Sequence, residues 1–272
     1  TAFAHPRAGP TGATQYRHPA SSRYFRIFPF VTNTVSHDTV TDAATAFEAA
    51  RQFGLFARRL DCLPIEAIRP SIPRFHDLDL RVAQFERSLG AGNRDRIAAC
   101  AGLIARARAY MGIADAYRAT LASGALRARL MHHDTKISNV LFDARSGKGV
   151  CVVDLDTVMP GTVLSDIGDM LRTYVCPVDE NHRELNDITI RPEIYAAVEA
   201  GYLGAMGDAM TSDERALFAF AGQFMIYMQA LRFLTDHLND DVYYGAAYPG
   251  QNRDRAANQF TLLERHIEAR NM

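Results

Sequence analysis

Apolar residues recur at intervals of three and four positions over most of the chain after residue 42, which is the spacing of one face of an α-helix. Asn93 can cap a long helix that spans most of residues 94–121 and contributes to the core. Asp42 or a neighbouring Thr can cap an earlier helix that ends before Pro64. Further helices are predicted over residues 78–88, from Pro192 in a first helical turn, after a cap at Ser212, and over residues 254–270.

Two regions have the pattern of short strands instead. Residues 24–31 alternate large apolar residues with others, and they are the only strand expected before residue 139. Residues 139–143 and 150–154 flank a glycine-containing turn, so they are predicted to pair as a hairpin.

These elements divide the chain into a loose start and one ordered body. Residues 1–22 are rich in Pro, Gly, Ala and Ser and show no period, so we expect a loose segment. Order is expected to begin near Arg23, with a short strand and a connector over residues 23–35. Residues 36–272 hold the helices and the hairpin, with neither an internal repeat nor a linker. The predicted fold class is α+β, a mainly helical lobe with a small β hairpin.

Composition narrows the range of partners. The chain has 272 residues, 48% of them hydrophobic, and its 30 basic and 31 acidic residues leave a net charge of −1. Without a strong positive field, nucleic acid and anionic membranes are not expected partners, and a small molecule or a protein is the default. The most apolar run, residues 216–234, is interrupted by Gln223, Gln229 and Arg232, so a buried helix explains it better than a membrane span.

Cysteine usage and the start of the chain favour one compartment. The four cysteines are widely spaced and form neither a CxxC pair nor a regular disulfide framework. The first residues lack a basic stretch followed by an apolar one, so they do not resemble a signal peptide. We therefore expect reduced thiols and a cytoplasmic protein, while no feature of the sequence indicates an oligomeric state.

The most informative motif is His132-x-Asp134-x-Lys136-x-x-Asn139, which an apolar strand follows. In the kinase catalytic loop an Asp receives the proton of the attacking hydroxyl and an Asn holds a magnesium ion. Asp134 and Asn139 occupy these two positions. Lys136 can place a positive charge near the phosphate oxygens, so Asp134 and Lys136 are the predicted catalytic residues.

The hairpin provides a second line of evidence for a metal site. If Asp143 pairs with Val150, Asn139 lies opposite Asp154. Oxygen ligands side by side suit a magnesium–nucleotide site, so Asn139 and Asp154 are the predicted metal ligands, with Asp156 as an optional third. Singly, each of these residues is more often a turn or cap residue, and it is their combination that favours a site.

Several sequence blocks together resemble the aminoglycoside phosphotransferase and choline kinase superfamily. They are the loop motif at residues 132–139, VDLDTVMPG at 153–161 and DIGDMLR from residue 166. Within the superfamily these blocks are most similar to N-acetylhexosamine 1-kinases, which phosphorylate N-acetylglucosamine and N-acetylgalactosamine at the anomeric hydroxyl. The resemblance runs from about Arg23 to about Gln259.

The resemblance implies a protein-kinase-like fold, with ATP as co-substrate and Mg²⁺ as cofactor. It implies that His132 and Asp166 brace the catalytic loop and do not react themselves. A C-terminal block implies that Arg232 and Tyr243 contact the sugar. The alternative for Arg232 is a structural ion pair with Asp236, four residues further along a helix.

The resemblance also assigns the N-terminal part. It makes residues 23–35 the last strand of the N-terminal lobe and the hinge, where the backbone of Pro29, Phe30 and Val31 meets adenine. No glycine-rich phosphate loop precedes residue 23, and both lysines of the chain lie downstream of the connector. We therefore expect the N-terminal β lobe to be largely missing and this chain to be weak or inactive alone. His133 stands where sugar kinases often have Asn.

Together these observations predict an ATP-dependent phosphotransferase that acts on the anomeric hydroxyl of an N-acetylhexosamine, with the sugar and the nucleotide as partners. Two alternatives stay open. One is a kinase for another small alcohol, such as an aminoglycoside, choline or homoserine. The other is a non-catalytic, kinase-like binding fragment.

Overall fold

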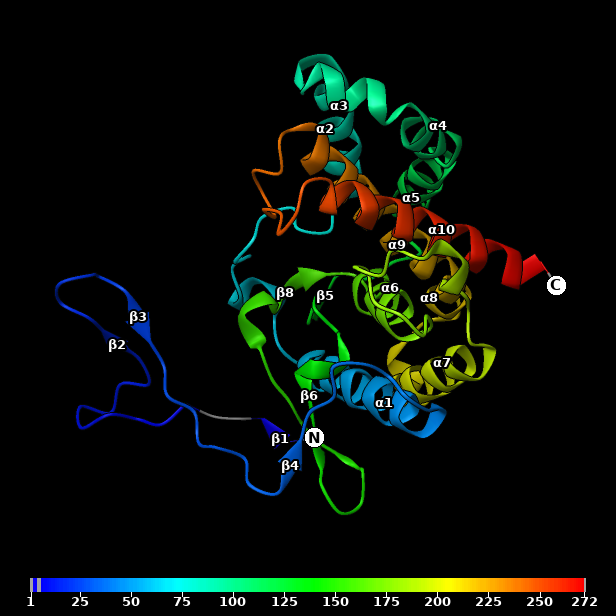
Figure 1. Ribbon diagram of the computed structural model, residues 1–272. Helices are drawn as coiled ribbons and strands as arrows, with labels where there is room; N and C mark the ends of the chain where they lie inside the picture. The colour runs from blue at the N-terminus through cyan, green and yellow to red at the C-terminus, as the bar shows by residue number, and fades with distance from the viewer. Residues whose placement is uncertain (1, 4–5, 272) are drawn as a thin grey trace.

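The computed structural model describes residues 2–3 and 6–271, and most of this part of the chain is helical (Figure 1). The helices are α1 Ala43–Leu60, α2 Leu78–Ala91, α3 Arg94–Ala99, α4 Ala101–Ala109, α5 Gly112–Ala122, α6 Val163–Tyr174, α7 Pro192–Met206, α8 Ser212–Ala216, α9 Phe218–Leu238 and α10 Gln251–Asn271. The strands are β1 Ala2–Phe3, β2 Tyr16–Arg17, β3 Tyr24–Phe25, β4 Thr34–Val35, β5 Arg129–Met131, β6 Val140–Asp143, β7 Gly149–Val152 and β8 Met159–Gly161. Short 3₁₀ turns η2 Ile137–Asn139 and η3 Leu155–Thr157 adjoin the hairpin.

Helix α9 forms the centre of the helical body. It packs against α10, α6 and α2, and its side chains Phe224, Met228, Leu231 and Phe233 are buried. The apolar run that the sequence assigns to a buried helix is therefore part of the core. Within residues 2–3 and 6–271, no helix combines the length and the apolar character needed to cross a bilayer.

Helix α1 lies against the small sheet on one side and α7 on another (Figure 1). The sheet has the strand order β1-β7-β6-β4, in which β1 runs parallel to β7 and the other pairs are antiparallel. Strands β5 and β8 form a separate antiparallel pair beside α1 and α6. The predicted α+β class, a helical lobe with a small β hairpin, is confirmed.

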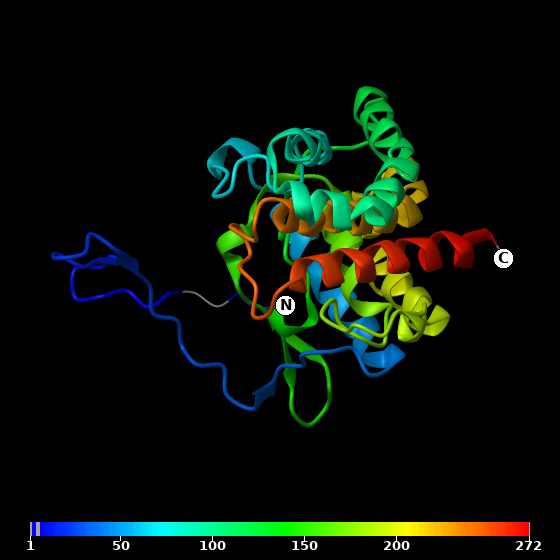
Figure 2. The same cartoon turned by 45° about the horizontal axis from the view of Figure 1, so that its top comes forward.

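The N-terminal strand is shorter than predicted. Within residues 24–31 only Tyr24–Phe25 is a strand, and with β2 it forms a hairpin that lies away from the helical body in both views (Figures 1 and 2). Ile27 and Phe30 are 72% and 87% exposed and Pro29 has no N–H to donate, so this stretch has neither cover nor a continuous β partner. The expectation of a single strand before residue 139 is also wrong. Strands β1, β2, β4 and β5 precede it, and each is too short to show an alternating pattern.

The β6–β7 hairpin forms, but its register differs from the predicted one. Val140 pairs with Val152, which places Asn139 opposite Val153 and not opposite Asp154. The N–H of Val153 donates to the carbonyl oxygen of Asn139 at 2.9 Å. Asp154 therefore lies one residue beyond the paired end of the hairpin.

The predicted pairing of Asp143 with Val150 is wrong, because the strands are already offset by one residue at Val140 and Val152, and a further register shift follows Leu141. One contact at this shift lies outside the hairpin. Gly149 donates its N–H to the buried carboxylate of Glu48 on α1, at 3.0 Å, so the end of β7 is held by the helix. A pattern read from the two strands alone contains no information about this contact.

The long helix predicted over residues 94–121 is divided into α3, α4 and α5. Asn93 does cap the first of them, and its side chain accepts two backbone N–H groups. The backbone leaves helical geometry at Cys100 and Tyr110, where ψ is 15° and 12°. Because α4 contacts α9 and α10 while α5 contacts α2 and α9, one straight helix could not follow this path around the core.

Other helix ends agree closely with the sequence pattern. Asp42 caps α1 through its side chain, and Pro192 is in the first turn of α7. The cap of α8 is Thr211, and Ser212 is the first helical residue. Glu214 decides this position, because it completes a capping box with Thr211.

Replacement of Gly168 by Ala is expected to destabilise the protein by about 2 kcal/mol or more, because overpacking a close contact forces backbone shifts. A Cβ at Gly168 would lie 2.4 Å from the carbonyl oxygen of Ala221, where α6 crosses α9. Gly204→Ala is the matched control. A Cβ there meets no atom within 4 Å, and it should stabilise α7 by about 0.5–1 kcal/mol. Urea unfolding measures both, and equal stability of Gly168→Ala and the parent would contradict the packing described.

Candidate active site

The loop between β5 and β6 carries four of the predicted site residues, His132, Asp134, Lys136 and Asn139. Asp134 Oδ2 lies 3.0 Å from Lys136 Nζ, and the side-chain amide of Asn139 donates to the same oxygen at 3.1 Å. The Asn139 amide also donates to the Asp134 carbonyl at 2.8 Å. The structure therefore brings the predicted base, the lysine and the amide together, as the motif indicated.

Asp166, in the first turn of α6, holds this loop in place through hydrogen bonds. Its buried carboxylate accepts the N–H groups of His132 at 3.1 Å and His133 at 2.8 Å. Its carbonyl accepts the hydroxyl of Thr135 at 2.8 Å. Burial raises the pKa of Asp166 to about 6.

His132 fixes the loop to the hairpin. Its Nε2 lies 3.0 Å from the carbonyl oxygen of Val153, and its ring packs edge-on against Phe53 and Phe56 of α1. The hydroxyl of Thr157 donates to the His132 carbonyl at 2.7 Å. His132 and Asp166 thus both contact the backbone of the loop and lie where a bracing role requires.

The sequence reasoning missed two further residues that hold the loop. Asp169 accepts the N–H of Thr135 at 2.8 Å, and the Tyr174 hydroxyl donates to the Thr135 carbonyl at 2.7 Å. Asp169 lies three positions after Asp166, on the same face of α6, so the helical spacing within the DIGD block could have revealed it.

Lys136 connects the loop to the other carboxylates. Burial opposes its charge, but the hydrogen bond to Asp134 and the negative charges of Asp134, Asp154 and Asp169 outweigh burial and raise its pKa. Lys136 is therefore a cation at neutral pH, close enough to three carboxylates to sense their charge.

Asp154 and Asp156 have different surroundings. Asp154 adopts a left-handed backbone with φ 59° and ψ 62° directly after β7, and it is exposed. The Asp156 carboxylate is 81% exposed and forms an ion pair with Arg26 at 3.3 Å. In the part of the chain that the structure describes, no group of three or more His, Cys, Asp or Glu residues is arranged to hold a metal.

The donor set that remains for Mg²⁺ is one amide and one carboxylate. The amide nitrogen of Asn139 is used by Asp134, and no residue among those described donates to its oxygen, so Oδ1 remains available as a ligand. Asp154 follows Val153, whose N–H is bonded to Asn139. Two hard oxygen donors, completed by phosphate oxygens and water, fit the way Mg²⁺ is bound in nucleotide sites.

A cavity of about 580 Å³ opens beside the loop. Asp134 and Lys136 line it together with Arg232 and Tyr243, the two residues implied to contact a sugar. Its wall also carries the charged residues Asp169, Arg172, Glu180 and Arg255, which the sequence reasoning did not single out. Most of that charge is neutralised within the wall, since Arg172 pairs with Asp169 and Glu180, and Glu180 also pairs with Arg255.

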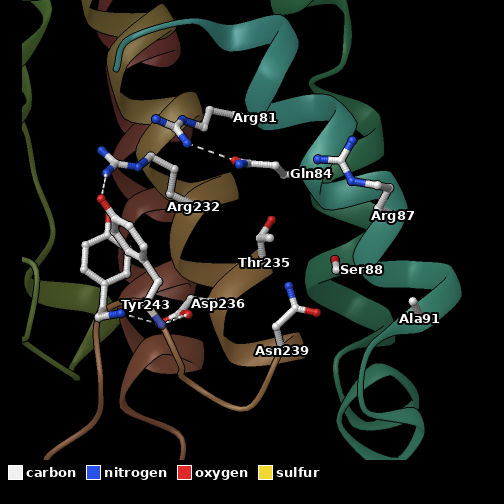
Figure 3. Close-up of a pocket in the computed structure, with 11 residues that line it drawn as sticks. Arg81, Gln84, Arg87, Ser88, Ala91, Arg232, Thr235, Asp236, Asn239 and Tyr243 are labelled. Atoms are coloured by element: carbon white, nitrogen blue, oxygen red, sulfur yellow. Dashed lines mark hydrogen bonds between the residues drawn. The ribbon is translucent and has the colours of Figure 1, made fainter. Parts of the chain in front are cut away.

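Arg232 does not form the structural pair with Asp236. Its guanidinium donates to Gln229 Oε1 at 3.1 Å and to the Tyr243 hydroxyl at 3.4 Å, the second of which is drawn in Figure 3. Asp236 instead accepts the backbone N–H groups of Tyr243 at 2.7 Å and Tyr244 at 2.9 Å. The Asp236 carboxylate therefore fixes the loop that carries Tyr243. Because Asp236 does not pair with Arg232, it does not neutralise the positive charge of Arg232 beside the cavity.

Two histidines, the half-buried His76 and the buried His133, form part of the same cavity wall, with ring centroids 5.3 Å apart. Burial lowers the pKa of His133 to about 4, with a further contribution from His132, and lowers that of His76 well below its usual range. Both rings are therefore neutral at pH 7. His133 has a left-handed φ of 67°, and Gly161 packs so closely against its ring that a Cβ there would lie 2.3 Å away.

A second cavity, of about 910 Å³, lies between the predicted hinge and the hairpin. Pro29, Phe30 and Val31 line it, and the facing wall includes Val152 and Asp154. Apolar faces on two sides with a carboxylate at one end suit a flat base attached to a metal-bound phosphate chain. The structure thus places the predicted hinge residues and the predicted metal ligand Asp154 around one space.

His133→Asn is expected to reduce the pH dependence of stability, and Asn tolerates the left-handed backbone. In the native state the ring stays neutral down to about pH 4, whereas unfolding frees it to protonate at about 6.5. The stabilising contribution is therefore present above pH 6.5 and lost as pH falls toward 4. Between pH 7.5 and pH 5 the wild type should lose about 2 kcal/mol more than the variant.

Urea unfolding at the two pH values measures this difference, in which the effects of other titrating groups largely cancel. Exposed His18 on the N-terminal hairpin supplies the control, because His18→Asn makes the same substitution at a ring that the protein does not bury. An identical pH dependence of wild type and His133→Asn would contradict the buried neutral ring.

Comparison with known proteins supports the fold. Three solved structures share the fold at low sequence identity. The "microcompartment-associated aminopropanol kinase" has a TM-score of 0.64 and 16% identity, over 98% of this chain and 76% of that one. An aminoglycoside phosphotransferase from Alicyclobacillus acidocaldarius subsp. acidocaldarius DSM 446 gives 0.61 and 14%, over 99% and 78%. A choline/ethanolamine kinase family protein from Mesorhizobium loti gives 0.52 and 14%, over 98% and 78%.

These likenesses show a protein-kinase-like fold in which a helical lobe carries small sheets. The family model described as "Phosphotransferase enzyme family" matches residues 4–212, which is most of the chain and includes the whole catalytic-loop motif. The chain therefore belongs to the APH phosphotransferase enzyme family.

Proposed function

We propose that this chain is an ATP- and Mg²⁺-dependent small-molecule kinase that phosphorylates the anomeric hydroxyl of an N-acetylhexosamine. One observation carries the proposal: Asp134 lines the same cavity as Arg232 and Tyr243. A carboxylate that can accept a proton thus shares one space with donors suited to sugar oxygens.

In the proposed reaction, Asp134 accepts the proton of the sugar hydroxyl while the hydroxyl oxygen attacks the γ-phosphorus of ATP and ADP leaves. Lys136 and Asn139 both contact Asp134 Oδ2, so they fix the orientation of the carboxylate. The second oxygen, Oδ1, is then the one that faces the acceptor. Lys136 also contributes positive charge beside the transferred group.

Asn139 and Asp154 would hold Mg²⁺, which when bound neutralises charge on the phosphate oxygens. Asp156 is the weaker candidate, because its carboxylate is already paired with Arg26. We assign residues 23–35 to the last N-lobe strand and the hinge, with Pro29, Phe30 and Val31 at the adenine. The loose segment would then be residues 1–22 and the helical lobe residues 36–272.

The charges around the cavity nearly balance, because its wall carries five carboxylates and four cations: Asp38, Asp134, Asp169, Asp179 and Glu180, and Lys136, Arg172, Arg232 and Arg255. Among the described residues of the wall, Asp134 pairs with Lys136, and Arg172 and Arg255 share Glu180. Arg232 donates to the neutral groups of Gln229 and Tyr243 and has no ion pair with a described carboxylate, so its guanidinium is available to bind acceptor oxygens. A sugar offers hydroxyl and acetamide oxygens that Arg and Tyr can bind.

A kinase for a different alcohol, such as homoserine, remains the alternative within the same chemistry, and a non-catalytic binding protein the alternative outside it. Arg26 is the one cation among the described residues that line the nucleotide cavity, and it is paired with Asp156. We therefore expect slow turnover, because the phosphates are weakly positioned. The four cysteines form no disulfide, which suits a reducing compartment, and we propose the cytoplasm.

Asp134→Asn should preserve the fold and lower turnover by about 1,000-fold, because a positioned general base typically contributes between 100- and 10,000-fold. ADP release with N-acetylglucosamine measures turnover, and circular dichroism checks the fold. Asp208→Asn, at an exposed carboxylate that lines neither of the two cavities, is the control and should keep its turnover. Retained turnover in Asp134→Asn would refute the assignment, and absence of Mg-ATP binding by calorimetry would favour the binding-protein alternative.

Arg232→Gln is expected to raise the KM for the acceptor by about tenfold to a hundredfold with a smaller change in kcat, since hydrogen bonds from a charged group are the stronger kind. Tyr243→Phe removes one hydroxyl and should give a smaller rise. Both are measured with a panel of N-acetylglucosamine, N-acetylgalactosamine, an aminoglycoside, choline and homoserine. Turnover confined to a non-sugar acceptor would exclude the sugar and leave the phosphotransferase chemistry intact.

A further inference from the structure

A third cavity, of about 430 Å³, lies between α2 and α9 and is shown in Figure 3. Arg232, Tyr243 and Tyr244 line both this cavity and the proposed acceptor cavity, so the two spaces share one wall. The proposed reaction uses none of the residues that α2 contributes. Its volume falls in the range of small-molecule sites.

Three arginines supply the charge of this cavity. Figure 3 shows Arg81 reaching from α2 toward Arg232 on α9, with Arg87 further along α2. None of the three forms an ion pair with a carboxylate among the residues that the structure describes. Arg81 donates instead to Gln84 Oε1 at 2.9 Å, which is a neutral acceptor.

The single carboxylate in the wall does not neutralise them. Asp236 is 5% exposed and accepts three N–H groups, from the backbone of Tyr243 and Tyr244 and from the side chain of Asn252. Its oxygens are therefore committed to the loop. With three cations and one committed carboxylate, the cavity has an excess of positive charge.

Two buried polar groups without hydrogen-bond partners also favour a bound anion. The Nε of Arg81 and the hydroxyl oxygen of Thr235 are buried without a hydrogen-bond partner within the described chain. Burial and the positive charge of Arg232 both lower the pKa of Arg81, so the folded protein holds two like charges near each other at a cost. An anion between them would remove the repulsion and occupy free donors.

We propose that the cavity between α2 and α9 binds the anionic group, phosphate or carboxylate, of a small molecule. Guanidinium groups present planar donors that match both anions. The volume leaves room for an organic portion beyond the charged group. The anion is either a substituent of the acceptor that extends past Arg232 or part of a separate ligand that binds beside the acceptor.

Calorimetric titration of the full chain with inorganic phosphate, at an ionic strength fixed with chloride, tests the site. The wild type should show saturable binding, and Arg81→Gln should weaken it by about tenfold or more, because charge-assisted hydrogen bonds are lost. Arg87→Gln should weaken it by several-fold. Arg108→Gln is the matched control and should bind like the wild type, because Arg108 is exposed on α4 and has no ion pair with any residue that the structure describes.

Arg81 also donates to the carbonyls of Arg74 and Phe75, so its replacement is checked by urea unfolding. Arg87 is exposed and donates to no backbone carbonyl among the described residues. If Arg81→Gln is unstable, the Arg87→Gln variant therefore still tests the site. Phosphate bound elsewhere, such as near Lys136, would not respond to either variant. Absence of saturable binding, or binding that both variants leave unchanged, would overturn the proposal.

A second titration identifies the source of the anion. If the anion belongs to the acceptor, N-acetylglucosamine 6-phosphate should bind at least about tenfold more tightly than N-acetylglucosamine, and Arg87→Gln should abolish the difference. If a separate ligand supplies it, N-acetylglucosamine 6-phosphate should bind no more tightly than N-acetylglucosamine, and inorganic phosphate should still bind when the sugar is saturating. The phosphate titration alone does not depend on the proposed kinase function, so the two can fail independently.

Discussion

The candidate site depends on one buried carboxylate, Asp166, that accepts two consecutive backbone N–H groups. His132 and His133 both donate to it, and this pair of bonds fixes the direction of the chain immediately before Asp134. His133 is held in a left-handed conformation that costs on the order of 1–2 kcal/mol for a residue with a Cβ. Two hydrogen bonds to a charged acceptor, together with the packing of the His132 ring, are large enough to offset this cost. The left-handed conformation of His133 and the buried carboxylate of Asp166 therefore act together to orient Asp134 toward the cavity.

Features determined by neighbours in sequence could be predicted well. The contact of Asn139 with Asp134 spans five residues, and the caps at Asp42 and Asn93 are set by the first turn of each helix. Such interactions are short-range, so a motif contains nearly all of the information that specifies them. The position of Arg232 and Tyr243 in the cavity of Asp134 came from family resemblance, since residues a hundred positions apart cannot be placed together by pattern alone.

Features determined by distant contacts could not be predicted. The hairpin register depends on Glu48, which is far from both strands in sequence and holds the N–H of Gly149. The division of residues 94–121 into three helices depends on the path around α9 and α10. Gly102 and Gly112 each follow a break by two residues, but a glycine inside a helical pattern does not by itself predict a break. Likewise, helical spacing allowed a pair between Arg232 and Asp236 as the alternative, but Asp236 accepts hydrogen bonds from the loop that follows the helix. In each case a tertiary contact overrides a local preference.

Arg232 lies where the acceptor cavity and the arginine-rich cavity meet, and its partners explain why its charge is available to both. The guanidinium lies 5.8 Å and 5.5 Å from the ring centroids of Tyr243 and Tyr244, and it donates to the amide oxygen of Gln229. Aromatic faces and an amide position a cation without neutralising it, whereas a carboxylate would cancel its field. A bound anion would offset part of the positive charge of Arg232 and restrict the motion of its guanidinium. It would therefore change the affinity of the acceptor cavity for molecules rich in oxygen. Because binding free energies are linked, an acceptor must then change anion binding by the same factor. The proposed phosphoryl transfer at Asp134 and the proposed anion site at Arg81 are therefore coupled through a single side chain.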